Sequence, residues 1–146
     1  MKRNILFMFF LLPFIAMGQT YKYIGIEDGL SNRRIFNIQK DSKGYMWFLT
    51  NEGMDRYNGK EIKHYKLVDE ENKRNAQNHL TWLFREKENL WIVGKTGKIF
   101  EYHHQFDRFI PTYKPANLSL SISYSYLDNR GNIWLCDKDS IILYNT

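Results

Sequence analysis

The sequence is poor in cysteine, and Cys136 is the only one in the chain. A single thiol cannot form an intramolecular disulfide, and it cannot supply the paired ligands of a CxxC zinc knuckle. No cysteine directly follows the apolar amino-terminal stretch, where a lipid could be attached. Because Cys136 lies in the apolar run 133–136, we expect it to pack as a small hydrophobic residue in the core.

Motifs that carry catalysis are also missing. The sequence has no Gly-x-Ser-x-Gly nucleophile turn and no glycine-rich phosphate loop. Adjacent His103 and His104 on a strand would point to opposite faces, which is a poor arrangement for a shared metal ion. The acids Asp41, Glu86 and Asp128 recur at equivalent positions, but each precedes a turn and so has a structural reason to be there. We therefore predict no enzymatic activity, no cofactor and no metal site.

Long apolar runs are absent outside the first 18 residues. Two basic residues precede an apolar run over 5–12, and the small residues Ala16 and Gly18 follow it. This order is typical of a secretory signal peptide over 1–18. An uncleaved membrane anchor is the alternative, but the run is shorter than the roughly 20 apolar residues of a spanning helix. We therefore expect residues 19–146 to be exported.

The charge does not favour nucleic acid as a partner. The chain has 21 basic and 16 acidic residues, a net charge of +5. Without Lys2 and Arg3 of the predicted signal peptide, 19 basic residues remain against 16 acids, a net charge of +3. These residues are interleaved along the chain, whereas nucleic-acid binding favours a clustered basic patch.

What the sequence does contain is a repeat built around tryptophan. Trp47, Trp91 and Trp134 lie 44 and then 43 residues apart, each within a similar phrase. A period of this length is typical of β-propeller blades. We predict an all-β fold, a partial β-propeller of about three four-stranded antiparallel blades in an open arc. The blades are expected at about 31–68, 77–113 and 119–146.

Turn residues divide the first unit into four strands, at 34–40, 45–50, 54–57 and 61–66. Asp and Gly at 41–44 predict a tight turn, and the Asn-Gly pair at 58–59 is the strongest hairpin signal in the chain. Residues 76–88 have local helical spacing, but alignment with the other units favours a strand. The charged stretch 69–78 is interpreted as a solvated loop between blades.

The repeat positions are expected to be structural. Glycines serve the turns, and each tryptophan is expected to fill the space between successive blades. The middle unit lacks a glycine in its first turn, which is also one residue shorter. The repeat positions are Asp41, Gly44, Trp47, Gly53, Tyr57, Trp91, Gly97, Tyr102, Asp128, Gly131, Trp134 and Tyr144.

These residues also carry a family resemblance. The phrase Gly29-Leu30-Ser31-Asn32, then Asp41-x-x-Gly44-x-x-Trp47-x-x-Thr50-x-x-Gly53-x-x-Arg56-Tyr57, resembles the two-component regulator propeller repeat. The resemblance implies a periplasmic sensor region of a hybrid two-component histidine kinase, whose paired ectodomains respond to an oligosaccharide released from a glycan. The family's membrane helix, kinase, receiver and DNA-binding domain have no counterpart in these residues, so a membrane connection is expected only through a missing carboxy-terminal parent region.

Strand counting predicts an incomplete ring. Residues 21–26 are expected to form a stray outer strand, and the third unit stops at Tyr144 after its third strand. Propellers need about four to eight blades to close, so three blades leave two apolar faces exposed. The chain is then a fragment of a longer sensor, the product of a truncated gene, or one copy of a ring closed by several copies. Its expected partners are the remaining blades or other copies of itself.

Polar loops suggest where a ligand could bind. Asn32, Arg33, Arg34, Asn78 and His79 lie in loops before the innermost strands, and their groups can hydrogen-bond sugars or uronates. Ordinary polar loops are the alternative. The predicted function is an exported sensor segment for a glycan-derived oligosaccharide. A stand-alone secreted carbohydrate- or protein-binding module and a propeller-type lyase or hydrolase fragment are the alternatives.

Overall fold

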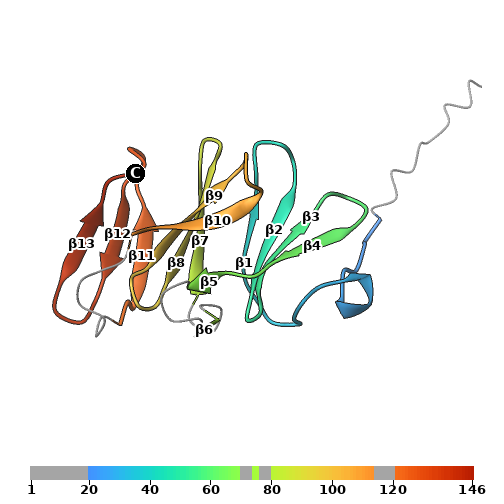
Figure 1. Ribbon diagram of the computed structural model, residues 1–146, viewed down its shortest axis with the longest axis horizontal. Helices are drawn as coiled ribbons and strands as arrows, with labels where there is room; N and C mark the ends of the chain where they lie inside the picture. The colour runs from blue at the N-terminus through green and yellow to red at the C-terminus, as the bar shows by residue number, and fades with distance from the viewer. Residues whose placement is uncertain (1–19, 70–73, 76–79, 114–120) are drawn as a thin grey trace, which may run out of the picture.

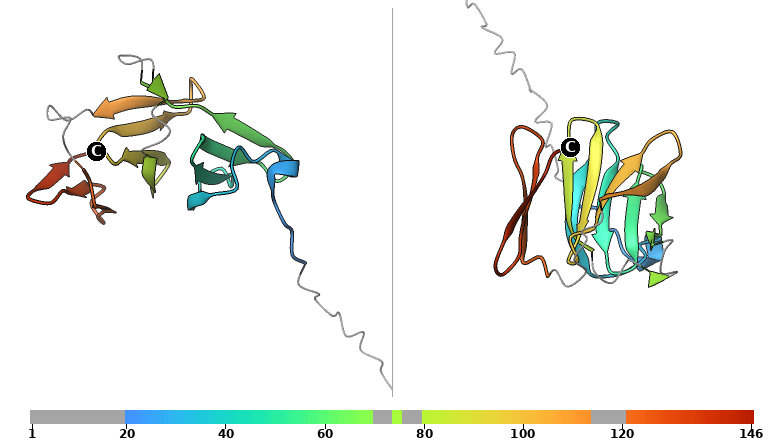
Figure 2. Two further views of the ribbon diagram at one scale, coloured as in Figure 1. Left: turned by 90° about the horizontal axis from the view of Figure 1, so that it is seen from below. Right: turned by 60° about the vertical axis from the view of Figure 1, so that its left-hand side comes forward.

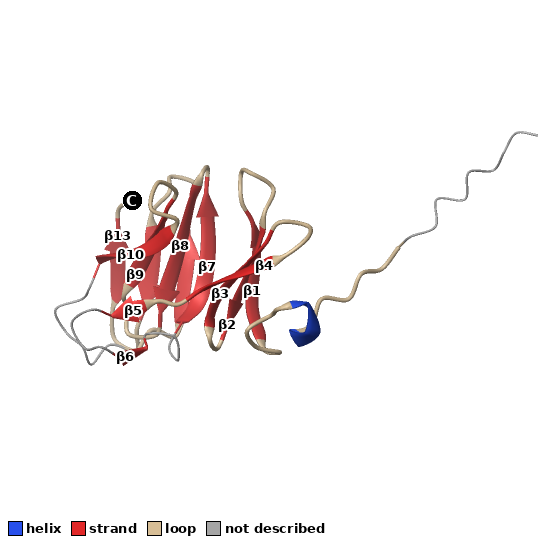
Figure 3. Ribbon diagram, turned by 45° about the vertical axis from the view of Figure 1, so that its right-hand side comes forward, coloured by secondary structure: helices blue, strands red, loops and turns tan. Residues whose placement is uncertain are grey.

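The computed structural model describes residues 20–69, 74–75, 80–113 and 121–146. Three antiparallel sheets stand side by side in an arc, and the chain passes through them in sequence order (Figures 1 and 2). Nearly all regular structure is strand, apart from one short 3-10 helix before the first sheet (Figure 3). The predicted all-β architecture of successive blades is confirmed.

Blade 1 contains four strands in the order β1-β2-β3-β4. These are β1 (Ile35–Lys40), β2 (Met46–Thr50), β3 (Gly53–Tyr57) and β4 (Ile62–Tyr65). The 3-10 helix η1 (Ile26–Asp28) precedes them. The Asn58 side-chain oxygen accepts hydrogen bonds from the backbone N–H groups of Lys60 and Glu61, which closes the turn between β3 and β4 as its sequence predicts.

Gly53 is required where β3 begins. Its φ is +129°, and a Cβ at this position would lie 2.4 Å from the carbonyl oxygen of Tyr65 on β4. Only a residue without a side chain fits between these two backbones. The glycine at this position of the first unit therefore has a steric cause.

Blade 2 has the same design in the order β7-β8-β9-β10. Its strands are β7 (Leu80–Glu86), β8 (Asn89–Gly94), β9 (Ile99–His103) and β10 (Arg108–Tyr113). The choice of strand over helix for the segment before Trp91 is thus confirmed. Between the blades, β5 (Val68–Asp69) pairs with β6 (Arg74–Asn75), so residues 69 and 74–75 are strand residues where a loop over 69–78 was predicted.

Blade 3 is a sheet of three strands, β11 (Tyr124–Leu127), β12 (Ile133–Cys136) and β13 (Ile141–Tyr144). Its third strand ends at Tyr144, as the sequence predicts. No helix among the residues that the structure describes has the length and apolar character needed to cross a bilayer.

The core consists of two interfaces between blades, because each sheet buries both of its faces only where it has neighbours on both sides. One cluster joins blades 1 and 2: Trp47, Leu49, Met54, Tyr65 and Leu67 with Leu83, Leu90, Ile92, Phe100 and Tyr102. The other joins blades 2 and 3: Trp91, Val93 and Ile99 with Ile122, Ile133 and Leu135. Blade 2 is therefore covered on both faces, and blades 1 and 3 on one face each.

Three expectations are wrong. Residues 21–25 form no strand and η1 occupies 26–28, because the described part of the chain provides no sheet edge beside them. Trp134 is 36% exposed, whereas Trp47 and Trp91 are buried at 0% and 4%. No blade among the described residues follows blade 3, so this tryptophan has nothing to fill. Cys136 lies on the same blade and is only half-buried.

Candidate functional site at the blade interfaces

Asp41 explains the spacing of the repeat phrase. Its Oδ1 accepts hydrogen bonds from the backbone N–H groups of Lys43 and Tyr45, both at 2.9 Å. Its Oδ2 accepts a hydrogen bond from Trp47 Nε1 at 2.8 Å. One buried carboxylate thus closes the first turn and fixes the indole that fills the interface. The acid-before-turn prediction is confirmed, and the bond to tryptophan adds a second reason for it.

Blade 3 repeats this arrangement at Asp128. Its Oδ1 accepts hydrogen bonds from the N–H groups of Arg130 at 2.8 Å and Asn132 at 2.9 Å, and its Oδ2 accepts one from Trp134 Nε1 at 2.9 Å. The hydrogen bond from Trp134, followed by those from Asn132 and Arg130, holds the pKa of Asp128 well below its usual range. Trp134 is thereby held in place although no further blade covers it.

Blade 2 lacks the equivalent bond. Glu86 precedes Trp91 by five residues instead of six, and the buried Trp91 Nε1 has no hydrogen-bond partner among the described residues. The Glu86 carboxylate pairs with the neighbouring Lys87 instead, at 3.0 Å. Lys87 itself has a φ of +53°, the conformation that glycine supplies in the other two turns.

Trp47 is the centre of an aromatic cluster that joins blades 1 and 2. Its ring centroid lies 5.2 Å from that of Tyr65, 4.7 Å from Tyr102 and 5.6 Å from Phe109. The Tyr102 and Phe109 contacts are edge-to-face, an arrangement that aromatic pairs favour. The guanidinium of Arg56 lies over the Trp47 ring at 5.4 Å, which adds a cation–π contact.

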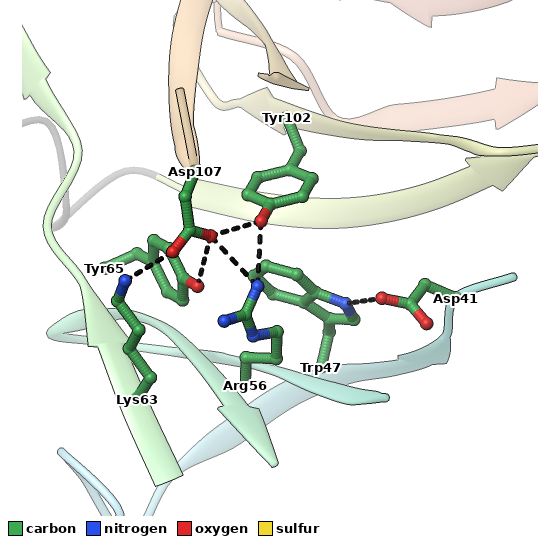
Figure 4. A network of polar contacts seen from close by, with 7 residues as sticks. All are labelled: Asp41, Trp47, Arg56, Lys63, Tyr65, Tyr102 and Asp107. Carbon is green, nitrogen blue, oxygen red and sulfur yellow. Dashed lines mark hydrogen bonds and ion pairs between the residues drawn. The ribbon is translucent and has the colours of Figure 1, made fainter. Parts of the chain in front are cut away.

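A polar cluster continues this interface toward the outer edge of the blades (Figure 4). Asp107, in the hairpin between β9 and β10, receives hydrogen bonds from four side chains of the two blades. These are Arg56 at 3.0 Å, Tyr65 at 2.7 Å, Lys63 and Tyr102. We call these five residues the Asp107 cluster.

The Asp107 cluster is charged at its centre. Burial alone would raise the pKa of Asp107, but hydrogen bonds from Lys63, Tyr102 and Tyr65, together with the charge of Arg56, hold it well below its usual range. Burial and then the hydrogen bond to Asp107 raise the pKa of Tyr102 to about 12. The cluster therefore joins a carboxylate to two cations and two neutral phenols across the boundary of blades 1 and 2.

A second polar group lies within blade 1, on the face that no blade covers. The carboxylate of Asp55 is completely buried and accepts hydrogen bonds from the N–H and hydroxyl of Ser31 at 2.8 and 2.9 Å. Its other oxygen lies 2.7 Å from His64 Nδ1. The Ser31 hydroxyl also lies 2.9 Å from that of Thr50. Because the serine contacts the acid and not the histidine, this is a structural anchor for the chain entering β1 and not a catalytic triad.

The predicted ligand-binding residues are placed only in part. The Asn32 side chain accepts a hydrogen bond from the N–H of Arg34 at 2.8 Å, and it therefore stabilises the entry to β1. Arg33 is exposed, and the guanidinium of Arg34 lies 5.0 Å from the centre of the Phe36 ring. Asn78 and His79 lie outside the described residues. A role for these five residues in binding stays a prediction.

Sequence reasoning missed the residues that carry most of the polar contacts. Arg56 was recognised only as part of the repeat phrase, and Asp107 lies in the β9–β10 hairpin, outside the recognised repeat positions. Strand alternation would have placed Asp55 and His64 on one face, since they are directly opposite in the register of β3 and β4. No signal in a single sequence would have connected Asp107 to a blade about fifty residues earlier.

Comparisons with known proteins agree with this architecture. Residues 29–52 match the model of the two-component regulator propeller. The extracellular domain of BT4673 from B. thetaiotaomicron, assigned there to a one-component system, is 26% identical with a TM-score of 0.60, and the match covers 78% of this chain and 17% of that one. No curated protein matches the sequence.

Two further solved structures share the fold. A structure of the BT4673 extracellular domain as a hybrid two-component system is 24% identical over 80% of this chain, with a TM-score of 0.61. The extracellular domain of the hybrid two-component system BT3049 from the same organism is 22% identical over 79%, with a TM-score of 0.60. This chain spans 17% of each of these longer chains. Residues 29–52 thus match the two-component regulator propeller repeat, in a chain that is similar in fold to the extracellular domains of bacterial one- and two-component systems.

Proposed function

We propose that this chain is a non-catalytic segment of an exported sensor propeller, which recognises a glycan-derived oligosaccharide for a two-component receptor. The observation that carries the proposal is the propeller repeat itself, with its Asp41–Trp47 bond, in a fold similar to extracellular sensor domains. The signal-peptide pattern over 1–18 supports export to the periplasm.

The exposed arginines at the entry to β1 support the choice of ligand. Arg33 is exposed in the loop before the innermost strand of blade 1, and Arg34 is exposed beside it. Guanidinium groups pair with carboxylates through two parallel hydrogen bonds, so an acidic sugar such as a uronate suits them. Loops on a rigid sheet scaffold are also where binding residues are concentrated.

Calorimetry with a panel of neutral and uronate-containing oligosaccharides tests the ligand. We expect binding of an acidic member, and a loss of at least about tenfold in affinity when Arg33 and Arg34 are both replaced by alanine. Lys43→Ala is the control, because Lys43 is also exposed and basic but lies at the opposite end of β1. Equal losses in both variants, or no binding by any sugar, would contradict this ligand.

The non-catalytic character and the export have separate tests. Incubation with the same oligosaccharides should leave them uncleaved in mass spectra, and products that accumulate with time would revive a lyase or hydrolase. Expression in a Gram-negative host should yield a periplasmic chain whose amino terminus is Gln19. A chain that keeps its first residues and stays with the membrane would contradict the signal peptide.

A further inference from the structure

Blade 3 has one apolar face that nothing in the described structure covers. The residues on it are Tyr124, Tyr126, Trp134, Ile141 and Leu143, all of them exposed. Trp134 occupies the repeat position at which Trp47 and Trp91 are buried by the following blade. The hydrogen bond to Asp128 already holds its indole as the bond to Asp41 holds that of Trp47. The face therefore resembles the faces of blades 1 and 2 that pack against a following blade.

Blade 1 exposes the other half of such an interface. Phe36 and Ile38 are exposed on the face directed away from blade 2. In the repeat, Ile38 corresponds to Leu83, which is completely buried against blade 1. On the uncovered face of blade 1, Ile38 thus occupies the position at which blade 2 receives the Trp47 side of its neighbour, beside the polar group around Asp55.

The amino-terminal segment precedes the innermost strand of blade 1 along the chain, as an outer strand precedes each later blade. Lys22 Nζ is 2.6 Å from the hydroxyl of Tyr57, so the segment before η1 contacts blade 1 at the end of β3. In the contact of blades 1 and 2, the outer strand β4 meets the hairpin of the next blade's outer strands through Tyr65 and Asp107. In chain order, residues 21–25 precede blade 1 as β4 precedes blade 2 and β10 precedes blade 3.

The two incomplete elements complement each other. Blade 3 has three strands where blades 1 and 2 have four, and no strand in the described part of the chain pairs with the outer edge of β13. Residues 21–25 belong to no sheet of the described structure, and Tyr23 is 90% exposed. Within one chain the two elements lie at opposite ends of the arc (Figure 2), so they cannot meet.

We propose that two copies of this chain associate head to tail, with blade 3 of one copy packed against the open face of blade 1 of the second. Residues 21–25 of the second copy then pair with β13 of the first as its fourth strand, a form of strand addition at an open sheet edge. The same contact can form at both ends of a pair, and two three-bladed arcs fall within the roughly four to eight blades of closed propellers.

Substitutions on each face test this association. Ile38→Asp places a charge on the open face of blade 1, and Leu143→Asp places one on the open face of blade 3. We expect the unmodified chain to sediment as a dimer and each variant alone as a monomer. An equal mixture of the two variants should form a dimer, because it retains one intact pair of faces. Ser42→Asp, in an exposed turn, is the control and should dimerise as the unmodified chain does.

The strand pairing has its own test. Tyr23→Pro removes an N–H that the added strand would use, and we expect the dimer to weaken at least tenfold in sedimentation, whereas Tyr23→Thr should leave it unchanged. Circular dichroism of every variant should retain the strand spectrum of the unmodified chain. A monomeric unmodified chain at all concentrations, or variants whose mixture stays monomeric, overturns the proposal and assigns the faces to blades of a longer chain. The proposal is also overturned if the unmodified chain and both aspartate variants form polydisperse aggregates.

Discussion

At the scale of single residues, the repeat depends on side chains that each serve two purposes. Asp41 orders a turn through two backbone N–H groups and fixes a tryptophan through its other oxygen. A buried carboxylate is stable only when it is fully hydrogen-bonded, and here the turn and the indole together supply the donors. Local folding of one hairpin is thereby linked to packing between two blades.

Replacing Asp41 should cost more than replacing its counterpart in blade 2. Asp41→Ala leaves the buried Trp47 N–H and two turn N–H groups without an acceptor, and we expect a loss of roughly 2–4 kcal/mol in unfolding free energy. Glu86→Ala removes a side chain that contacts no indole and should cost well under half as much. Urea unfolding measures both, and equal losses would show that the indole bond contributes nothing.

Two glycines in positive-φ conformations provide a second comparison. Gly53→Ala adds a methyl 2.4 Å from the Tyr65 carbonyl oxygen, so the two backbones must move apart, and we expect a cost of about 2–4 kcal/mol. Gly59 has a φ of +99° with nothing within 4 Å, so Gly59→Ala should show the conformational cost alone, about 1 kcal/mol. Thermal unfolding separates the two, and a smaller loss at Gly53 would contradict the steric reason.

At the scale of elements, blades 1 and 2 are joined by an apolar cluster and a polar cluster. The aromatic cluster around Trp47 excludes water from the middle of the interface between blades 1 and 2. The Asp107 cluster closes its outer edge with a carboxylate between two cations. Salt bridges at a surface contribute little, but hydrogen bonds from two buried phenols add strength and direction to this one.

The Asp107 cluster predicts a dependence of stability on pH. The folded-state pKa of Asp107 lies below its unfolded value, so its contribution is fully present above about pH 4 and is lost as the pH falls from there toward the folded-state pKa. We expect the unfolding free energy to fall on acidification below about pH 4, with a smaller fall in Asp107→Asn.

Asp139→Asn is the matched control for this measurement. Asp139 is exposed in the turn between β12 and β13, and its replacement should leave the acid branch of the stability profile as it is in the unmodified chain. Denaturant titrations at a series of pH values give the profiles. If the unfolding free energy of Asp107→Asn falls with pH as steeply as that of the unmodified chain, the Asp107 cluster does not contribute to acid unfolding.

The sequence predicted the elements better than the contacts between them. Turn residues such as Asp41 and Gly53 act over a few positions, so a single sequence carries their signal. The segment before Trp91 has local helical spacing, and only the repeat identified it as a strand, because tertiary packing overrides a weak local preference. Asp107 contacts Arg56 only because blades 1 and 2 pack against each other, and no short-range sequence pattern predicts a contact between residues so far apart.

At the scale of the whole molecule, the three blades of the arc differ in how much of their surface is packed against a neighbour. Blade 2 is packed on both faces, blade 1 has one uncovered face that residues 29–31 partly protect, and blade 3 has an uncovered face and only three strands. Two expectations were wrong for the same reason: that Trp134 fills the space between two blades, and that residues 21–26 form a strand. Both assume a neighbouring blade or sheet edge that the described residues do not provide.

Hydrogen exchange should follow this order of support. Amides of β8 should exchange slowest, those of β2 at an intermediate rate and those of β12 fastest, because local opening is easiest where the fewest apolar contacts must break. Mass spectrometry of the exchanging chain at low concentration, where association is suppressed, measures this order. Equal protection in all three sheets would mean that the arc unfolds as a single cooperative unit.

The six-residue interval from Asp41 to Trp47 also limits how such hairpins can diverge. Deleting one loop residue moves the acid out of reach of the ring nitrogen, and Trp91 shows the outcome, a donor without an acceptor deep in a contact. A buried indole N–H without a hydrogen-bond acceptor destabilises the fold, and a phenylalanine ring has no such donor. Hairpins with the shorter loop should therefore accept phenylalanine readily at this position, and hairpins with the longer loop should retain tryptophan.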